Sequence, residues 1–196
     1  QTMTVQLFCG DCLEIMPMLA EKSIDAVICD PPYGTTSAKW DFIIPLELMW
    51  QNLLRISKKN AAMVLFCSQP FTSDLITSKK ILFRHSWIWN KKQSGSFFNA
   101  KYGPLRITED VAVFAIQKPA YYPIMRNGKM RLKGGAKSPC KTASNGLMTF
   151  ETINDEYFPV NILEFPNCAN KQDNVHPTQK PVELMEYLIK TYTQEG

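Results

Sequence analysis

The sequence Ile24-Asp25-Ala26-Val27-Ile28-Cys29-Asp30-Pro31-Pro32-Tyr33-Gly34 contains the feature on which the predicted fold depends. Its apolar run from Ala26 to Cys29, rich in β-branched residues, is typical of a buried parallel strand. Two prolines end the run after Asp30, because proline fixes φ and has no N–H to donate to a neighbouring strand. Gly34 then allows the chain to turn again. This pattern predicts a stiff loop at the carboxyl end of a strand, where open α/β sheets bind ligands.

The residues of this loop suit the recognition of an –NH2 group. Asp30 accepts hydrogen bonds when ionised, and the carbonyl of Pro31 is a second acceptor, so the pair matches the two hydrogens of an amine. Tyr33 offers a flat ring face to a planar partner. An exocyclic amine held in this way loses conjugation with its ring, and its nitrogen is free to attack an electrophile. The alternative interpretation is a proline-rich turn in which Asp30 only caps a helix.

The composition is that of an ordinary globular protein. The chain has 196 residues, 45% of them hydrophobic and 20% charged, which is enough for one domain or slightly more with a sizeable core. No apolar run approaches the roughly 20 residues of a membrane span, and residues 1–10 lack the pattern of a signal peptide. We therefore expect a cytoplasmic protein with no membrane partner. Cys9 and Cys12 have the spacing of a redox motif, but no second pair accompanies them, so we expect no metal or disulfide.

Strand and helix patterns alternate along the first 117 residues. Strands are predicted at residues 5–8, 26–29, 61–67, 83–89 and 111–117. Helices are predicted at residues 13–19, 46–57 and 71–79. This alternation indicates an α/β fold with a mostly parallel sheet and helices on both faces. A further strand-like run spans residues 160–165, and a last helix with one apolar face begins at Pro181, with Thr178 as its expected cap.

The composition changes after Gln117. Residues 118–150 contain no acid and seven basic residues, which are Lys118, Arg126, Lys129, Arg131, Lys133, Lys137 and Lys141. Hydrophobic periodicity is lost in the same segment. Basic residues without acids attract a phosphate backbone, although a solvated basic segment is the alternative. We predict three parts: a catalytic core at residues 1–117, a basic recognition insertion at residues 118–159, and a return to the core at residues 160–196.

A second segment mixes basic and aromatic residues. Between Asn90 and Gly103, three lysines alternate with aromatic side chains, namely Lys91, Lys92 and Lys101 with Phe97, Phe98 and Tyr102. Lysines contact phosphates and aromatic rings stack on bases, so this mixture suits nucleic acid. A solvated loop with buried phenylalanines is an equally weighted alternative. Trp50 is expected in the core, and His85, which has no visible partner, is expected to pack or to lie on the surface.

Asp30-Pro31-Pro32-Tyr33 resembles the catalytic motif of S-adenosylmethionine-dependent amino-methyltransferases that act on DNA bases, and the motif also occurs in enzymes that methylate guanine N2 in ribosomal RNA. Two more segments are similar to the beta group of the DNA enzymes. Gly10-Asp11 matches a pair that lies beside the adenine of the cofactor in that group, although Asp11 also suits a helix cap. His176-Pro177-Thr178-Gln179-Lys180-Pro181 matches the segment beside the methionine part. The order of catalytic loop, basic insertion and this last segment is that of the beta group.

This resemblance implies an α/β, Rossmann-like methyltransferase fold with an irregular basic insertion. It implies S-adenosylmethionine as the cofactor and the N6 amine of adenine in double-stranded DNA as the acceptor, reached by base flipping. The residues expected in catalysis are Asp30, Pro31, Pro32 and Tyr33. Those expected to bind the cofactor are Asp11, Asp30, His176, Pro177, Thr178, Gln179 and Lys180. Those expected to bind DNA are Lys91, Lys92, Lys101, Arg126, Lys129, Arg131, Lys133 and Lys137.

Several alternatives remain open at this stage. The same loop serves cytosine-N4 and RNA amino-methyltransferases, and a non-catalytic DNA-binding module is a third interpretation. Asp30 favours adenine, because some cytosine-N4 enzymes carry serine at that place. The beta group is often dimeric, so a homodimer is compatible with the resemblance. The group also has a Phe-x-Gly-x-Gly turn after its last helix, and this sequence contains no Gly-x-Gly. We therefore expect a truncated enzyme that binds S-adenosylmethionine weakly or not at all on its own.

Overall fold

A computed structural model describes residues 4–36, 38, 41–94, 97–133, 152–168 and 178–194 of the chain. The chain divides into two compact units. One unit comprises Gln1–Tyr122 together with Asn161–Gly196, and the other comprises Pro123–Val160. The predicted insertion at residues 118–159 overlaps the second unit.

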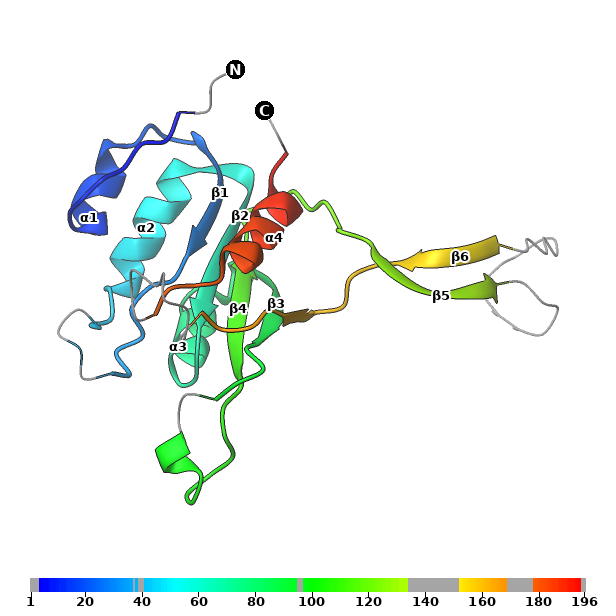
Figure 1. Cartoon of the computed structure of the whole chain (residues 1–196). Helices are drawn as coiled ribbons and strands as arrows, with labels where there is room; N and C mark the ends of the chain where they lie inside the picture. The colour runs from blue at the N-terminus through cyan, green and yellow to red at the C-terminus, as the bar shows by residue number, and fades with distance from the viewer. Residues whose placement is uncertain are drawn as a thin grey trace. The chain divides into compact units, whose positions relative to one another are not determined.

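A five-stranded sheet forms the centre of the first unit, with the strand order β1-β2-β4-β3-β7 (Figure 1). The strands are β1 (Ile24–Cys29), β2 (Ser57–Cys67), β3 (Phe83–Asn90), β4 (Thr108–Phe114) and β7 (Ile162–Glu164). The pairs β1–β2 and β3–β7 are parallel, while β4 is antiparallel to both of its neighbours. Four strands therefore run in one direction and β4 runs against them. This arrangement confirms the expected Rossmann-like, mostly parallel sheet.

Helices cover both faces of this sheet (Figure 1). The helix α4 (Val182–Tyr192) packs on one face, and α2 (Leu46–Ile56) and α3 (Phe71–Ser78) pack on the other. The inner strand β2 contributes to both layers. Alternate residues such as Val64 and Phe66 face α4, while Met63 and Leu65 face α2 and α3. A strand that is covered on both faces needs apolar residues at every position, which explains the unbroken run that predicted it.

The N-terminal segment differs from its prediction, because residues 5–8 form no strand. The side chains of Val5 and Leu7 are 80% and 91% exposed. Within the described residues, β1 is an edge of the sheet and pairs only with β2. β-branched residues form a strand only where a neighbour accepts their backbone hydrogen bonds, and residues 5–8 have no such neighbour there.

The helix that follows is shorter than predicted. It consists of α1 (Cys12–Ile15) and the 3₁₀ helix η1 (Met16–Met18), which contains Pro17. Proline has no N–H to continue the helical hydrogen bonds, so the regular helix ends early. Asp11 is the N-cap, and its Oδ1 accepts a 2.8 Å hydrogen bond from the backbone N–H of Leu13. The capping interpretation of Asp11 is therefore confirmed.

Two other predicted boundaries also change. The strand expected at residues 111–117 begins three residues earlier, at Thr108. The N-cap of α4 is Pro181, which makes no side-chain capping bond. The prediction that Thr178 caps this helix was therefore wrong. The buried face of α4 consists of Leu184, Leu188, Thr191 and Tyr192. The remaining short helices of the first unit are η2 (Lys80–Leu82) and η3 (Phe97–Asn99).

The core contains the aromatic residues that were expected there. Trp50 is fully buried, and its indole N–H donates to the hydroxyl of Ser78 at 2.7 Å. His85 lies against α4, where its Nε2 is 2.8 Å from the hydroxyl of Tyr192. The packing role predicted for both residues is confirmed.

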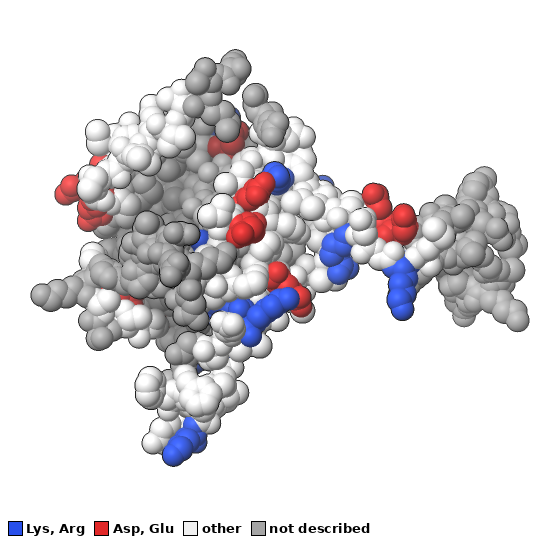
Figure 2. All heavy atoms as spheres, viewed as in Figure 1, with Lys and Arg blue, Asp and Glu red and all other residues white. Residues whose placement is uncertain are grey.

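The second unit contains a hairpin of two antiparallel strands, β5 (Arg126–Lys133) and β6 (Thr152–Tyr157). The ring of Tyr157 packs on Gly128, where an added Cβ would lie 2.6 Å from the ring. The hydroxyl of Tyr157 also donates to the carbonyl of Lys129 at 2.8 Å. Figure 2 shows basic and acidic side chains next to one another on this unit. In the described part of the chain, no helix has the length and apolar character needed to cross a membrane.

Candidate active site

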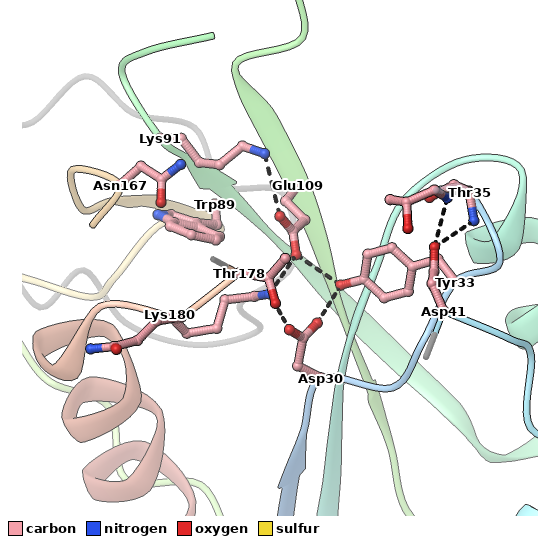
Figure 3. A pocket seen from close by; sticks show the side chains of 12 residues that line it. Asp30, Tyr33, Thr35, Asp41, Trp89, Lys91, Glu109, Asn167, Thr178 and Lys180 are labelled. Atoms are coloured by element: carbon pink, nitrogen blue, oxygen red, sulfur yellow. Dashed lines mark hydrogen bonds and ion pairs between the residues drawn. The ribbon is translucent and has the colours of Figure 1, made fainter. Parts of the chain in front are cut away.

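A cavity of about 220 Å³ opens at the carboxyl ends of β1 and β3, beside the start of β4 (Figure 3). The residues that line it are Asp30, Tyr33, Thr35, Thr36, Asp41, Trp89, Lys91, Glu109, Asn167, Thr178, Gln179 and Lys180. Its position is the one that the sequence predicts for the ligand site of an α/β sheet. Most of these side chains are polar or charged, so the cavity suits a ligand that makes several hydrogen bonds.

Asp30 follows β1 directly and faces this cavity. Its Oδ1 accepts a 2.7 Å hydrogen bond from the hydroxyl of Tyr33, and its Oδ2 is paired with the ammonium group of Lys180. The Asp30 side chain is 30% exposed, so the carboxylate is neither packed into the core nor remote from an opening. An ionised carboxylate has about four lone-pair positions. Two are used here, and the carboxylate can still accept hydrogen bonds from a ligand.

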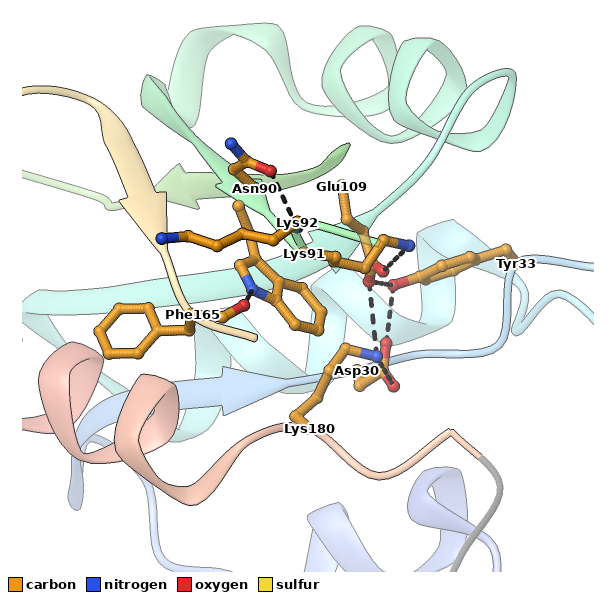
Figure 4. A network of polar contacts seen from close by, with 9 residues as sticks. Asp30, Tyr33, Asn90, Lys91, Lys92, Glu109, Phe165 and Lys180 are labelled. Atoms are coloured by element: carbon orange, nitrogen blue, oxygen red, sulfur yellow. Dashed lines mark hydrogen bonds and ion pairs between the residues drawn. The ribbon is translucent and has the colours of Figure 1, made fainter. Parts of the chain in front are cut away.

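Glu109 forms the second half of a charged network (Figure 4). Its Oε1 lies 2.8 Å from the hydroxyl of Tyr33 and 3.4 Å from the Lys180 nitrogen, and its Oε2 pairs with Lys91 at 3.3 Å. Only 10% of the Glu109 side chain is exposed. Two carboxylates and two ammonium groups thus surround one phenol. Burial, together with the charges of Glu109 and Asp30, raises the pKa of Tyr33 well above its ordinary value.

The ring of Tyr33 is held by a second aromatic side chain. It stacks on Phe71 at the start of α3, with 5.5 Å between the ring centroids and 22° between the planes. This contact fixes the ring, while the two carboxylates fix its hydroxyl. The Tyr33 side chain is thus held at both its ring and its hydroxyl.

Asp41 holds the loop that follows Tyr33. Its carboxylate accepts hydrogen bonds from three consecutive backbone N–H groups, those of Gly34 at 2.9 Å, Thr35 at 2.9 Å and Thr36 at 2.6 Å. Partial burial acts to raise the pKa of Asp41, but the hydrogen bonds from residues 34–36 outweigh it and lower the pKa. Gly34 has φ of +66°, which side chains other than glycine rarely adopt. The loop after the Asp-Pro-Pro-Tyr sequence is thus anchored by one carboxylate.

The structure brings together some of the residues predicted to bind the cofactor. Thr178, Gln179 and Lys180 line the same cavity as Asp30, although they are about 150 positions later in the chain. His176 and Pro177 lie outside the described residues. Asp11 caps α1 and does not line this cavity.

The two prolines of the catalytic motif do not line the cavity either. Pro31 is buried and Pro32 is half-buried. They shape the turn, and the contact expected from the Pro31 carbonyl stays a prediction.

The residues predicted to bind DNA fall into different environments. Lys91 points into the cavity and pairs with Glu109, and Lys92 pairs with Glu164 at 3.1 Å. Lys101, Arg126 and Lys129 are exposed. Arg131 and Lys133 belong to β5, and Lys137 lies outside the described residues. The aromatic residues of the same loop are also exposed, with Phe97, Phe98 and Tyr102 at 76%, 96% and 89%.

Three residues of the cavity were not predicted from the sequence: Glu109, Asp41 and Trp89. Glu109 is one of two adjacent acids at the start of an apolar strand. Acids at the end of a buried strand could have marked it as a candidate site residue. It reaches the cavity only because β4 is antiparallel, which places the start of β4 beside the carboxyl ends of its neighbours. Trp89 was predicted as part of a strand, and its indole N–H donates to the carbonyl of Phe165 at 2.8 Å. Among the described residues, no three His, Cys, Asp or Glu side chains gather as metal ligands would.

Comparison with known proteins connects this site with a family. A family model described as DNA methylase, of the N6/N4 type, matches residues 24–196, from the start of β1 onward. The chain belongs to this DNA methylase family. Both sides of the cavity lie within the matched residues, including Asp30 and Lys180.

Two curated relatives of this chain extend the comparison. The type II methyltransferase M.HpaI of Haemophilus parainfluenzae is 24% identical over 208 residues, covering 99% of this chain and 62% of the relative. The DNA adenine methyltransferase YhdJ of Escherichia coli K12 is also 24% identical, covering 95% of this chain and 67% of the relative. The chain thus spans roughly two thirds of the length of these relatives.

Solved structures support the fold. The crystal structure of the M1.HpyAVI–SAM complex aligns with a TM-score of 0.59 and 21% identity, over 97% of this chain and 78% of that one. The cytosine-N4-specific PvuII DNA methyltransferase aligns with a TM-score of 0.60 and 14% identity, over 95% and 70%. The five-stranded sheet and its covering helices are therefore those of a known methyltransferase architecture.

Proposed function

We propose that this protein transfers a methyl group from S-adenosylmethionine to the exocyclic amine of a DNA base, the N6 amine of adenine. The observation that carries this proposal is the position of Asp30. Its carboxylate lies at the wall of a cavity, keeps spare lone pairs, and is fixed by a rigid phenol. An –NH2 group donates to such an acceptor, and its nitrogen is then oriented for attack on an electrophile.

The cavity also fits part of the cofactor. S-adenosylmethionine carries an ammonium and a sulfonium group, both cationic, and a carboxylate. Asp30 and Glu109 offer negative charge, and Lys180 offers the positive charge that a carboxylate requires. Ligand sites are typically about 300–1,000 Å³, so the volume of about 220 Å³ suits the methionine end alone. Asp30, Thr178, Gln179 and Lys180 would hold that end, and the cofactor would supply the electrophilic methyl group.

The target base has to leave the double helix to reach this cavity. We propose that the ring of Tyr33, which borders the cavity, stacks on the flipped base. Base–aromatic stacking contributes about 1–3 kcal/mol per base. The exposed residues Lys101, Arg126 and Lys129 then contact phosphates. A cytoplasmic location and a homodimer are parts of the same proposal.

The first experiment identifies the product. The purified full-length protein is incubated with labelled S-adenosylmethionine and with double-stranded DNA or RNA, and the nucleosides are separated by mass spectrometry. N6-methyladenine from DNA is the expected product. N4-methylcytosine, or a methylated base from RNA only, would reassign the substrate. Salt-sensitive DNA binding with no methylated base would identify a binding module instead.

The first prediction concerns Asp30. We expect Asp30→Ala to abolish methylation by the full-length enzyme, because the amine loses its acceptor. Cofactor binding should fall far less, because Thr178, Gln179 and Lys180 still line the cavity. Asp25→Ala is the matched control. Asp25 is on β1, the strand that Asp30 follows, but its side chain is 69% exposed and pairs with Lys58. Asp25→Ala should methylate DNA at the wild-type rate. Substantial activity of Asp30→Ala in the same assay would show that the role assigned to Asp30 is wrong.

A further inference from the structure

The phenol of Tyr33 has more acceptors than protons. Its oxygen is 2.7 Å from Asp30 Oδ1 and 2.8 Å from Glu109 Oε1, both within ordinary hydrogen-bond distance (Figure 4). A phenol has one O–H group, and ionised carboxylates only accept. Tyr33 can therefore donate fully to only one of the two carboxylates. The second contact becomes a normal hydrogen bond only when that carboxyl group itself carries a proton.

Asp30, Tyr33 and Glu109 thus make two contacts through one phenolic oxygen but have only one proton between them. With one added proton, the phenol donates to one carboxyl group and accepts from the other. The two contacts are similar, at 2.7 and 2.8 Å, so the added proton can reside on either Asp30 or Glu109. Hydrogen-bonded chains of this kind pass protons by exchanging donor and acceptor roles, without movement of heavy atoms.

The proposed reaction produces a proton to accept. When the amine nitrogen forms its bond to the methyl group, the methyl–sulfur bond breaks and the nitrogen becomes a positively charged aminium. The nitrogen must then lose one proton to give the neutral methylated base. Asp30 is the acceptor that touches the amine, so it takes this proton first. Once protonated, Asp30 is no longer an anionic acceptor for the amine of the next base. The proton must therefore leave Asp30 before the next turnover.

We propose that Glu109 receives this proton through the hydroxyl of Tyr33. Asp30 donates its proton to the Tyr33 oxygen while the phenolic proton passes to Glu109 Oε1, which restores the Asp30 carboxylate. No oxidant, metal or second reactant is required. The inference rests on the proposed function, because it requires an amine that is methylated beside Asp30. It assigns Glu109 a role in the reaction that neither composition nor motif indicates.

The surroundings of Glu109 suit a group that takes the proton and passes it on. Glu109 is more enclosed than Asp30, with 10% against 30% of its side chain exposed. Lys91 and Lys180 both approach Glu109, at 3.3 and 3.4 Å. Their positive charges favour the ionised carboxylate, so the proton stays on Glu109 only briefly. The N–H groups of the two lysines offer routes for its release to solvent. The neighbouring Asp110 contacts the hydroxyl of Thr72 instead.

The experiment compares single-turnover methylation rates of Glu109→Gln, Tyr33→Phe and the double variant. General acid–base groups typically contribute about 10²–10⁴-fold, and we expect each single variant to lose on the order of 10²-fold. The double variant should be no slower than the slower single variant, because either change breaks the same relay. Asp110→Asn, which removes an acid one position away on β4, is the matched control and should keep the wild-type rate.

Chemical rescue separates proton acceptance from simple positioning. Glu109→Ala leaves room for a small carboxylate, so added formate should restore part of its rate, while the wild-type rate stays independent of formate. A full rate in Glu109→Gln, strictly additive losses in the double variant, or no response to formate would each overturn the relay. Absence of methylation by the wild-type protein would instead count against the proposed function, and the relay would fail with it.

An infrared titration tests the relay without any cofactor. As the pH is lowered, the wild-type protein should gain a band of a hydrogen-bonded, protonated carboxyl group. Asp110→Asn should retain this band, and Glu109→Gln should lack it. If Glu109→Gln shows the band unchanged, Glu109 is not the group that takes up the proton.

Discussion

At the scale of single residues, the site depends on a few positions that fix a loop. Tyr33 is held by Phe71 on its ring and by two carboxylates at its hydroxyl. Asp41 then fixes the next three backbone amides. The Asp30 carboxylate that faces the cavity is therefore held in place before any ligand arrives. Such preorganisation lowers the cost of binding and orienting an amine.

Gly34 is the residue of this loop that tolerates substitution least. Its φ is +66°, and an added Cβ would lie 2.9 Å from the side chain of Ile43. We expect Gly34→Ala to lower the free energy of unfolding by about 1–2 kcal/mol, since an alanine in the left-handed region costs that much. Urea denaturation measures the change.

Gly103→Ala is the matched control for this prediction. An added Cβ at Gly103 meets no atom within 4 Å, and its φ is not in the left-handed region. Its effect on the free energy of unfolding should be near zero. Equal losses in the two variants would show that Gly34 is not specially constrained.

At the scale of elements, α4 is attached to the sheet by polar contacts as well as by its apolar face. The hydroxyl of Tyr192 accepts a 2.7 Å hydrogen bond from the indole N–H of Trp87 and lies 2.8 Å from His85 Nε2. The hydroxyl keeps its own proton to donate, and it donates to His85 Nε2 when that nitrogen carries no proton. Burial lowers the pKa of His85 below its ordinary value of 6.5. The folded protein thus favours neutral histidine at this position.

This contact predicts a pH dependence of stability. The unfolded chain binds a proton at His85 more readily than the folded one, so unfolding is favoured as the pH falls. The stability from neutral His85 is complete above about pH 6.5 and decreases as the pH falls from there toward the lowered pKa. We expect the free energy of unfolding to drop between about pH 7.5 and pH 5.5, with a smaller drop in His85→Gln. Chemical denaturation at several pH values measures both slopes, and equal slopes would contradict the assignment.

The elements of the sheet show what the sequence could predict. The patterns that marked β1, β2, β3 and α2 are strong, because a strand or helix buried between layers needs apolar residues at fixed intervals. Asp30 and Lys180 were predicted as site residues, and they meet in one cavity. These predictions depended on local patterns and motifs that do not require knowledge of the topology.

The missed features depend on the topology. An apolar run has the same pattern in either direction, so nothing in the sequence showed that β4 is reversed. The role of Glu109 follows from that reversal. Residues 5–8 have the pattern of a strand but no described strand to pair with, which only the whole sheet can show. Contacts between residues far apart in the sequence, such as that of His85 with Tyr192, likewise could not be predicted from local patterns.

At the scale of the whole molecule, the two units differ in composition. The first holds the apolar core and the cavity, while the described part of the second is a hairpin with exposed charges. β5 carries Arg126 and Lys129, and β6 carries Asp155 and Glu156. A small, charged unit of this kind contributes little to a core. Contact with a phosphate backbone is the proposal that best accounts for its basic strand.

The hairpin predicts a salt-dependent contribution to DNA binding. We expect the double variant Arg126→Gln and Lys129→Gln to weaken DNA binding at low salt and to reduce the slope of log K against log salt by about 2, because roughly one counterion is released per phosphate contact. Fluorescence anisotropy with labelled duplex DNA measures the slope. Glu156→Gln, a neutralisation on the opposite strand, is the control. It should not weaken binding, and an unchanged slope in the double variant would remove the hairpin from the DNA interface.

The reversal of β4 has a consequence for how this protein could diversify. Because β3 and β4 are antiparallel neighbours, the segment between them leaves and re-enters the sheet at the rim of the cavity, where the N–H of Lys91 donates to the carbonyl of Ile107 at 2.8 Å. That backbone bond and the pair Asn90–Thr108 close the base of the segment. We expect the pairing of β3 with β4 to survive exchanges within residues 92–106, and such exchanges would test whether the segment affects the choice of target base.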